Sequence, residues 1–316
     1  MKICLVTPAA KGSRSGNRVT ATRWSRILRQ LGHRVHVHTE YDGSPADALV
    51  AIHAWRSAGS VAAFRAAWPG KPVVVLLAGT DIYRFAHSHR ATTVATMAAA
   101  DRLVGLHEGV GEDIPAEFRS RLHIIYQSAV PLPGPREPVR RWFQVCVIGH
   151  LREEKDSLRT ALAARRLPAS SRIKVVQLGA AHDESWAKAA DDEMRLNPRF
   201  AWRGEVPRGV VRRCFARSHA MVISSVMEGG ANVVSEAMVA GLPVIASEIP
   251  GNLGLLGKGH PAYYPARDDA ALASLLLRAE SEPGFLEQIA ASGAARAARF
   301  EPERELQAWR DLLAAL

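Results

Sequence analysis

The stretch SVMEGGANVVSEAMVAGLPVIA, residues 225–246, decides how the chain folds. Two glycines follow the carboxylate of Glu228, and they let the backbone approach a ligand closely. A helical pattern comes next; Gly241 ends it, and a β-rich run starts after Pro243. A glycine turn, a helix and a strand in this order are typical of a parallel α/β sheet. The free N–H groups at the start of such a helix suit a phosphate.

Two carboxylates bracket this helix. Glu236 lies two turns into it and on a face similar to that of Glu228. Carboxylates in these places can hydrogen-bond sugar hydroxyls while phosphates lie at the helix start. A carboxylate in the turn can equally serve the helix dipole, and the spacing alone leaves both interpretations open.

The alternation of strand and helix patterns runs through the whole chain. In the first half, β-rich runs predict strands at Lys2–Thr7, Arg34–His38, Ala48–His53, Val73–Leu77, Arg102–Leu106 and Leu122–Tyr126. The segment from Val130 to Pro138 holds four prolines and reads as a linker, since prolines continue neither a helix nor a central strand. Beyond it, strands are expected at Phe143–Ile148, Ile173–Leu178, Ala220–Ser224 and Val244–Ser247.

These patterns predict an α/β protein with two Rossmann-like, doubly wound domains, residues 1–135 and 136–316, facing each other across a cleft. A last amphipathic helix, from Pro302, is expected to close the chain and to be able to cross back to the first domain. Ligands of such sheets bind at the carboxyl ends of the strands.

The composition narrows the function classes. The 316 residues carry a formal charge of +10, which fits either solvated arginines or attraction of anionic substrates. Basic runs no longer than two residues argue against nucleic acid binding. Without an apolar run of about 18 residues or a signal peptide, we expect a cytoplasmic protein with no integral membrane segment.

A second segment, residues 147–156 (VIGHLREEKD), carries charges after a strand. The strand ends at Gly149, and Arg152 and Lys155 follow at the start of a helix. Two cations in this place can neutralise a leaving diphosphate. The alternative is a solvated, charged helix start.

Three turns of the first half are also candidates for ligand contact. The turn before Asn17 lacks the G-x-G-x-x-G fingerprint, although Glu40 leaves a nicotinamide enzyme as an alternative. Asp81 follows a buried strand, where it is either a ligand contact or a turn-holding residue. His53 ends another strand and is equally open between ligand contact and structure. The histidine pairs at 36 and 38 and at 87 and 89 lack carboxylate or cysteine support, so no metal site is expected.

The 225–246 stretch resembles the E-x7-E signature of the family 4 glycosyltransferases, which have the GT-B fold, including their Gly-x-Pro-Val-Ile-Ala run. In that family the first Glu contacts the transferred sugar and the second holds the nucleotide ribose. Residues 147–156 resemble its Gly-Arg-Leu-x-x-Glu-Lys-Gly motif. Lys155 matches the Lys of the motif, and His150 stands where the motif has its Arg. We therefore expect Arg152 to take the role of that Arg. The resemblance implies catalytic roles for Arg152, Lys155 and Glu228, and donor binding by Gly149, Gly229, Gly230, Ala231, Asn232, Val233 and Glu236.

The first half shares further features with this family. Residues 78–83 (AGTDIY) resemble its His-Gly-Thr-Asp segment, with Ala78 in place of the His. The family's glycine loop after the first strand faces donor phosphates and acceptor. The implied acceptor-binding residues are Gly16, Asn17, Arg18, His53, Thr80 and Asp81.

Seven short segments narrow the resemblance to one subgroup, the selenosugar synthases of selenoneine biosynthesis. They are Gly16–Asn17, Thr22–Trp24, Ala48–Ala54, Ala78–Tyr83, Gly149–Arg152, Met227–Gly230 and Gly251–Gly254. The subgroup transfers N-acetylglucosamine from UDP-N-acetylglucosamine to selenophosphate, which implies a carbon–selenium product and no cofactor or metal. Ionised selenium is already a nucleophile and needs no general base, which agrees with Ala78. A transferase acting on a sugar or lipid hydroxyl, and a sugar-binding protein without catalysis, remain alternatives.

Overall fold

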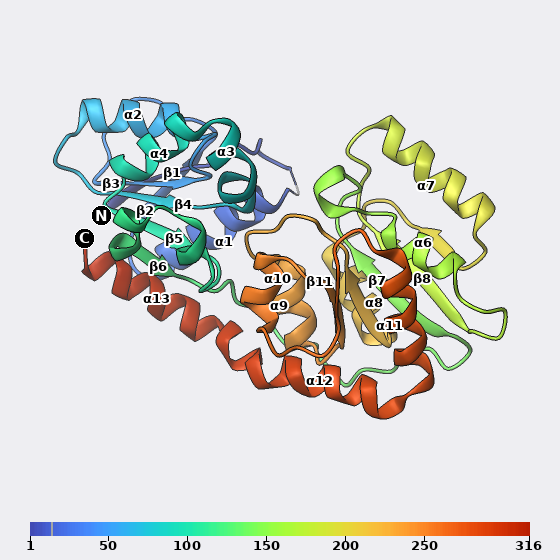
Figure 1. Ribbon diagram of the computed structural model, residues 1–316. Helices are drawn as coiled ribbons and strands as arrows, with labels where there is room; N and C mark the ends of the chain where they lie inside the picture. The colour runs from blue at the N-terminus through green and yellow to red at the C-terminus, as the bar shows by residue number, and fades with distance from the viewer. Residues whose placement is uncertain (14) are drawn as a thin grey trace. The chain divides into compact units, whose positions relative to one another are not determined.

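The computed structural model describes residues 1–13 and 15–316. The chain divides into two compact units, each with its own sheet (Figure 1). The N-terminal unit comprises Met1–Gln127 and Pro302–Leu316, and the C-terminal unit comprises Ser128–Glu301. The division therefore falls a few residues before the expected boundary at 135, and the last helix is part of the N-terminal unit.

The N-terminal unit is built on a parallel sheet in the order β2-β1-β3-β4-β5-β6. Its strands are β1 (Lys2–Val6), β2 (Arg34–His38), β3 (Ala48–Ile52), β4 (Val73–Leu76), β5 (Arg102–Gly105) and β6 (Leu122–Ile124). Its helices are α1 (Gly16–Gln30), α2 (Ala58–Ala67), a π-helix η1 (Asp81–Phe85), α3 (Ala86–Ser88), α4 (Arg90–Ala99), α5 (Val110–Asp113), a 3-10 helix η2 (Ala116–Arg121) and α13 (Pro302–Ala314).

Both faces of this sheet are buried, because successive side chains of a strand point to opposite faces. On β1, Ile3 and Leu5 join one apolar cluster, and Cys4 and Val6 join the other. The C-terminal helix α13 completes the first cluster: its Trp309 ring meets the Trp24 ring of α1 edge to face at 4.8 Å. Glu305 also accepts a 3.1 Å hydrogen bond from the Trp24 indole. These contacts fix α13 within the N-terminal unit.

The C-terminal unit repeats this plan in the order β12-β11-β10-β7-β8-β9, again with parallel pairings. Its strands are β7 (Phe143–Ile148), β8 (Ile173–Leu178), β9 (Phe200–Trp202), β10 (Ala220–Ile223), β11 (Val244–Ser247) and β12 (Tyr263–Tyr264). Its helices are η3 (Glu153–Lys155), α6 (Arg159–Arg165), α7 (Glu184–Leu196), α8 (Arg208–Arg217), α9 (Asn232–Val239), α10 (Pro250–Leu256), α11 (Asp269–Ser281), α12 (Pro283–Ala297) and η4 (Ala298–Phe300).

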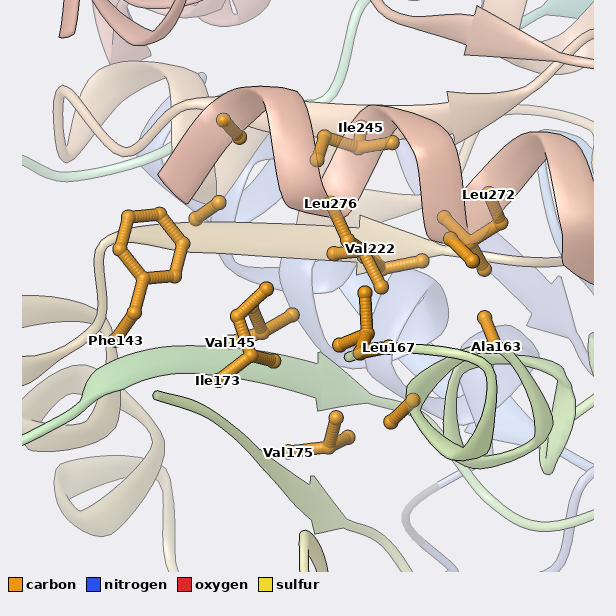
Figure 2. Close-up of a cluster of buried hydrophobic side chains, with 14 of the residues drawn as sticks. Phe143, Val145, Ala163, Leu167, Ile173, Val175, Val222, Ile245, Leu272 and Leu276 are labelled. Carbon is orange, nitrogen blue, oxygen red and sulfur yellow. The ribbon is translucent and has the colours of Figure 1, made fainter. Parts of the chain in front are cut away.

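The core of this unit lies between the sheet and its helices. Figure 2 shows Leu272 and Leu276 of α11 pointing toward the strands, where Val222 of β10 lies beneath them. These three side chains are at most 1% exposed. A core of this kind holds the strands rigidly, and it thereby fixes where their carboxyl ends and the following loops lie.

The expected strands are confirmed, with ends that differ by at most two residues. The short strands β9 and β12 were not predicted, because two or three residues carry too little periodicity. Within residues 1–13 and 15–316, no helix is both long and apolar enough to cross a membrane.

Candidate active site

Two loops of the C-terminal unit meet where β7 and β10 end. Because these strands are parallel neighbours, the loops that follow them start at the same edge of the sheet. The Ser224 hydroxyl donates a 3.0 Å hydrogen bond to the Lys155 carbonyl, and the Val226 N–H donates one of 2.9 Å to the Glu154 carbonyl. The two motifs found in the sequence therefore form one surface.

A lysine and a glutamate form the centre of this surface. The Lys155 ammonium contacts Oε1 of Glu228, and the Ser225 hydroxyl donates to the same oxygen at 2.6 Å. The Lys155 side chain is 20% exposed and that of Glu228 10%, so water screens this pair little. An ammonium has three donors and Glu228 occupies one. Lys155 can therefore hold the carboxylate and still donate to a bound anion.

Arg152 adds a second cation to the loop that carries Lys155. Its side chain is 43% exposed, and Nε lies 3.9 Å from the Glu154 carboxylate, beyond hydrogen-bond distance. Within the described chain, this Nε is buried and has no hydrogen-bond partner. Arg152 thus has donor capacity for an anionic ligand.

The start of α9 faces the same loops. Gly230 has φ +123°, a conformation that favours glycine, and Ala231 at the N-cap offers no side chain to cap the helix. One polar atom in the first turn, Oδ1 of Asn232, is buried without a hydrogen-bond partner in the described chain. Further along α9, Glu236 lies 3.2 Å from a guanidinium nitrogen of Arg208, whose side chain is 61% exposed. The helix thus offers open N–H groups at its start and a carboxylate two turns on.

Two glycines that are not catalytic candidates hold these loops close to their neighbours. A Cβ on Gly251 of α10 would lie 2.2 Å from the Glu228 carbonyl oxygen, and one on Gly179 would lie 2.0 Å from that of Gly149. Such contacts leave no room for a side chain. Behind Glu228, the Ser247 hydroxyl donates a 2.5 Å hydrogen bond to the Ser225 carbonyl. The position of Glu228 is therefore set by α10 and β11 as well as by its own loop.

At the corresponding edge of the N-terminal unit, Asp81 is fully buried. Its carboxylate accepts backbone hydrogen bonds from Ala54, Trp55 and Ala78 at 2.8, 2.8 and 2.9 Å. These bonds tie the turn after β3 to the turn after β4. The geometry thus favours the turn-holding interpretation of Asp81 over direct ligand contact.

His53 and Thr80 lie beside this carboxylate. His53 Nδ1 is 2.7 Å from Asp81 Oδ1, and His53 Nε2 is 2.9 Å from the Thr80 hydroxyl. The ring of His53 is 1% exposed, whereas Thr80 is half-buried. Although Ala78 leaves its turn without the histidine of related sequences, a histidine reaches the same turn from the neighbouring strand.

The other acceptor candidates occupy the first turn of α1, after β1. Gly16 is exposed there, and Asn17 and Arg18 are half-buried. They follow the strand next to β3 at the carboxyl edge of the sheet, although no hydrogen bond within the described chain joins them to His53 or Thr80. The structure thus places them at the same edge as the His53 turn, and no hydrogen bond of the described residues links the two.

A histidine that the sequence analysis passed over, His107, follows β5. It is fully buried, and neither ring nitrogen has a hydrogen-bond partner in the described chain. Burial lowers the pKa of His107 below its ordinary value. A buried ring of this kind is held neutral at physiological pH.

Comparison with known proteins assigns the C-terminal unit to a family. Residues 140–296, which include Arg152, Lys155, Glu228 and Glu236, match the family described as Glycosyl transferases group 1. The chain therefore contains a glycosyltransferase domain. Curated protein sequences gave no significant match.

Solved structures place the glycosyltransferase in the GT-B fold. HepE from Anabaena, in complex with UDP and glucose, aligns over 100% of both chains with a TM-score of 0.79 and 16% identity. Sucrose-phosphate synthase from Thermosynechococcus elongatus also aligns over 100% of both, with a TM-score of 0.79 and 17% identity. The lipopolysaccharide outer core galactosyltransferase WaaB aligns over 100% of this chain and 99% of its own, with a TM-score of 0.69 and 16% identity.

Residues 1–13 and 15–316 contain no group of three or more His, Cys, Asp or Glu side chains arranged to hold a metal ion. The rings of His36 and His38 lie 6.4 Å apart on β2. The candidate ligand-binding charges at the edge of the C-terminal sheet are instead the cations Arg152 and Lys155 and the carboxylates Glu228 and Glu236.

Proposed function

We propose that this glycosyltransferase moves N-acetylglucosamine from UDP-N-acetylglucosamine to selenophosphate, forming a carbon–selenium bond. The observation that supports a nucleotide-sugar donor is the contact between Lys155 and Glu228 beside the start of α9. The choice of selenophosphate as the acceptor is supported by the seven segments that resemble the selenosugar synthases.

The donor would lie along the carboxyl edge of the C-terminal sheet. Glu228 would accept hydrogen bonds from hydroxyls of the transferred sugar, and Glu236 would accept them from the ribose. Gly149 and Gly229–Val233 would let the diphosphate approach backbone N–H groups. The complex of HepE with UDP and glucose supports this proposal, since that protein has the same fold.

Charge develops on UDP as it leaves. Arg152 and Lys155 would stabilise that charge, each contributing roughly 3–4 kcal/mol to the transition state if they act like other preorganised donors. Their charge and the dipole of α9 would do the work that a divalent cation does in other transferases. The proposed reaction therefore needs no metal and no cofactor.

The acceptor would bind at the edge of the N-terminal sheet. Selenophosphate is an anion, and the N–H groups at the start of α1, with Asn17 and Arg18 on its first turn, suit an anion. A second candidate, a sugar or lipid hydroxyl, is favoured by one observation, the hydrogen bond between His53 and Thr80, because a hydroxyl nucleophile needs a base.

A competition experiment separates these two acceptors. The enzyme is incubated with UDP-N-acetylglucosamine and equal amounts of selenophosphate, simple sugars and lipid alcohols, and the products are identified by mass spectrometry. We expect a selenium-containing sugar as the main product, and Glu228→Gln, which keeps the size of the side chain, should slow its formation. Efficient glycosylation of a sugar or lipid without any selenium-containing product would overturn the proposed acceptor and leave the transferase assignment intact.

A further inference from the structure

The residue that follows Lys155 has an uncommon backbone conformation. Asp156 has φ +44° and ψ 50°, the left-handed region that glycine adopts freely and other residues seldom do. It ends the 3-10 helix η3, and its N–H donates to the Glu153 carbonyl. A residue with a side chain keeps such a conformation only where surrounding contacts hold it. The contacts of Asp156 therefore show what fixes this turn.

An arginine at the start of α6 binds the Asp156 carboxylate with two donors. Nε of Arg159 donates a 2.8 Å hydrogen bond to one carboxylate oxygen, and Nη2 donates one of 3.3 Å to the other. Nη1 of the same guanidinium donates to Asp269 of α11 at 3.2 Å. None of the three side chains is more than 23% exposed, so water screens these pairs little. Arg159 thus clamps Asp156 to two helices of the C-terminal unit.

The conformation of Asp156 also determines what the neighbouring carbonyl groups reach. The carbonyl oxygens of Lys155 and Asp156 lie 3.0 and 3.1 Å from one hydroxyl, that of Ser224, directly after β10. Because φ and ψ of Asp156 set the direction of its carbonyl relative to that of Lys155, both oxygens meet Ser224 in this conformation. The next residue, Ser225, donates to the same Glu228 oxygen that Lys155 contacts. The clamp on Asp156 is therefore connected to the Lys155–Glu228 pair.

We propose that Asp156 and Arg159 are positioning residues of the transfer reaction. Arg159 holds Asp156 in the left-handed conformation, and this conformation sets the Lys155 ammonium against Glu228. The inference rests on the proposed role of Lys155 at the donor diphosphate. The Asp156 carboxylate is needed only as the acceptor for Arg159. A residue that adopts the left-handed conformation unaided should therefore make the clamp dispensable.

Two substitutions of Asp156 separate its conformation from its charge. Asp156→Ala and Asp156→Gly both remove the carboxylate, but only glycine adopts a positive φ freely. The left-handed conformation disfavours a residue with a side chain roughly 5- to 150-fold, so Asp156→Ala should lower kcat roughly tenfold. Asp156→Gly should stay within about threefold of the wild-type kcat, and both should keep the KM for UDP-N-acetylglucosamine. Equal losses of kcat in the two variants would overturn the inference.

A double substitution tests whether Arg159 acts through Asp156. Arg159→Met keeps a long side chain without the guanidinium and should lower kcat roughly tenfold, measured as UDP release with the acceptor that the competition experiment identifies. Adding Asp156→Gly should restore kcat to within about threefold of wild type, which a mere loss of the Asp269 contact would not allow. Arg166→Met is the matched control: it removes the other guanidinium that pairs with Asp269, leaves the Asp156 pair in place, and should not change kcat.

Hydrogen–deuterium exchange of the full chain gives a measurement that does not depend on sugar transfer. The N–H of Asp156 bonds the Glu153 carbonyl, and the N–H of Arg159 bonds the Asp156 carbonyl. Exchange over residues 153–159 should be about tenfold faster in Arg159→Met than in the wild type or the double variant. A folded Arg159→Met enzyme with wild-type kcat and exchange would overturn the inference, as would a double variant as slow as Arg159→Met. If no acceptor is glycosylated, the proposed function fails, and the exchange rates alone decide whether Arg159 holds the turn.

Discussion

Replacing Gly251 by alanine should displace Glu228 without touching any charged group. The added Cβ would lie 2.2 Å from the Glu228 carbonyl oxygen and 2.9 Å from its Cβ. Ordinary contact begins at 3.4 Å, so 3.4 − 2.2 gives a displacement of 1.2 Å at that oxygen. Misplacing a catalytic group by about 1 Å costs on the order of 100-fold in rate, which is about 2.7 kcal/mol. We therefore expect Gly251→Ala to lower kcat/KM about 100-fold in a UDP-release assay.

The control for this substitution is another glycine of the C-terminal unit. A Cβ on Gly284 of α12 would meet nothing within 4 Å, so Gly284→Ala should leave the kinetics unchanged. Crowding also costs about 1–3 kcal/mol of stability, so the melting temperature of each variant is measured to confirm that it is folded during the assay. A folded Gly251→Ala enzyme with the wild-type kcat/KM would refute the argument that α10 fixes Glu228.

Three further predictions concern the donor, the metal and pH. Glu236→Ala should weaken UDP binding by about 1–3 kcal/mol in calorimetry, because ribose hydroxyls lose their acceptor, and an unchanged affinity would remove Glu236 from the site. Activity should survive EDTA; complete loss that magnesium or manganese restores would show that Arg152 and Lys155 do not replace a metal. Burial lowers the pKa of His107, so below about pH 6.5 the unfolded chain binds more protons and the free energy of unfolding falls. Urea denaturation between pH 5 and 7 measures how steeply the free energy of unfolding falls as the pH is lowered. That slope should be smaller in His107→Leu, by at most about 1.4 kcal/mol per pH unit, and an equal slope in both proteins would contradict a lowered pKa of His107.

The sheets were predictable from the sequence because strand runs, glycine stops and the proline linker are local signals. β7 and β8, for example, have the predicted bounds. The two motifs were likewise visible, and Lys155 and Glu228 both lie at the predicted edge of the sheet. The direct contact between Lys155 and Glu228 could not be predicted, because 73 residues separate them and only the pairing of β7 with β10 brings their loops together.

In the N-terminal unit, too, contacts between residues distant in the sequence could not be predicted from local patterns. The sequence left His53 open between ligand contact and structure, and it treated Asp81 in the same way. Both questions depend on a contact between turns 27 residues apart, which no spacing rule expresses. The positive φ of His53 also has no sequence signal, because only a small minority of non-glycine residues of any type adopt it.

The most direct test of the proposed reaction is the bond that it forms. The enzyme is incubated with selenophosphate and UDP-N-acetylglucosamine that carries carbon-13 at the anomeric position, and the product is examined by carbon NMR. We predict a labelled anomeric carbon with one-bond coupling to selenium-77. Label found only in free N-acetylglucosamine or in an oxygen-linked product, without selenium coupling, would contradict the proposal.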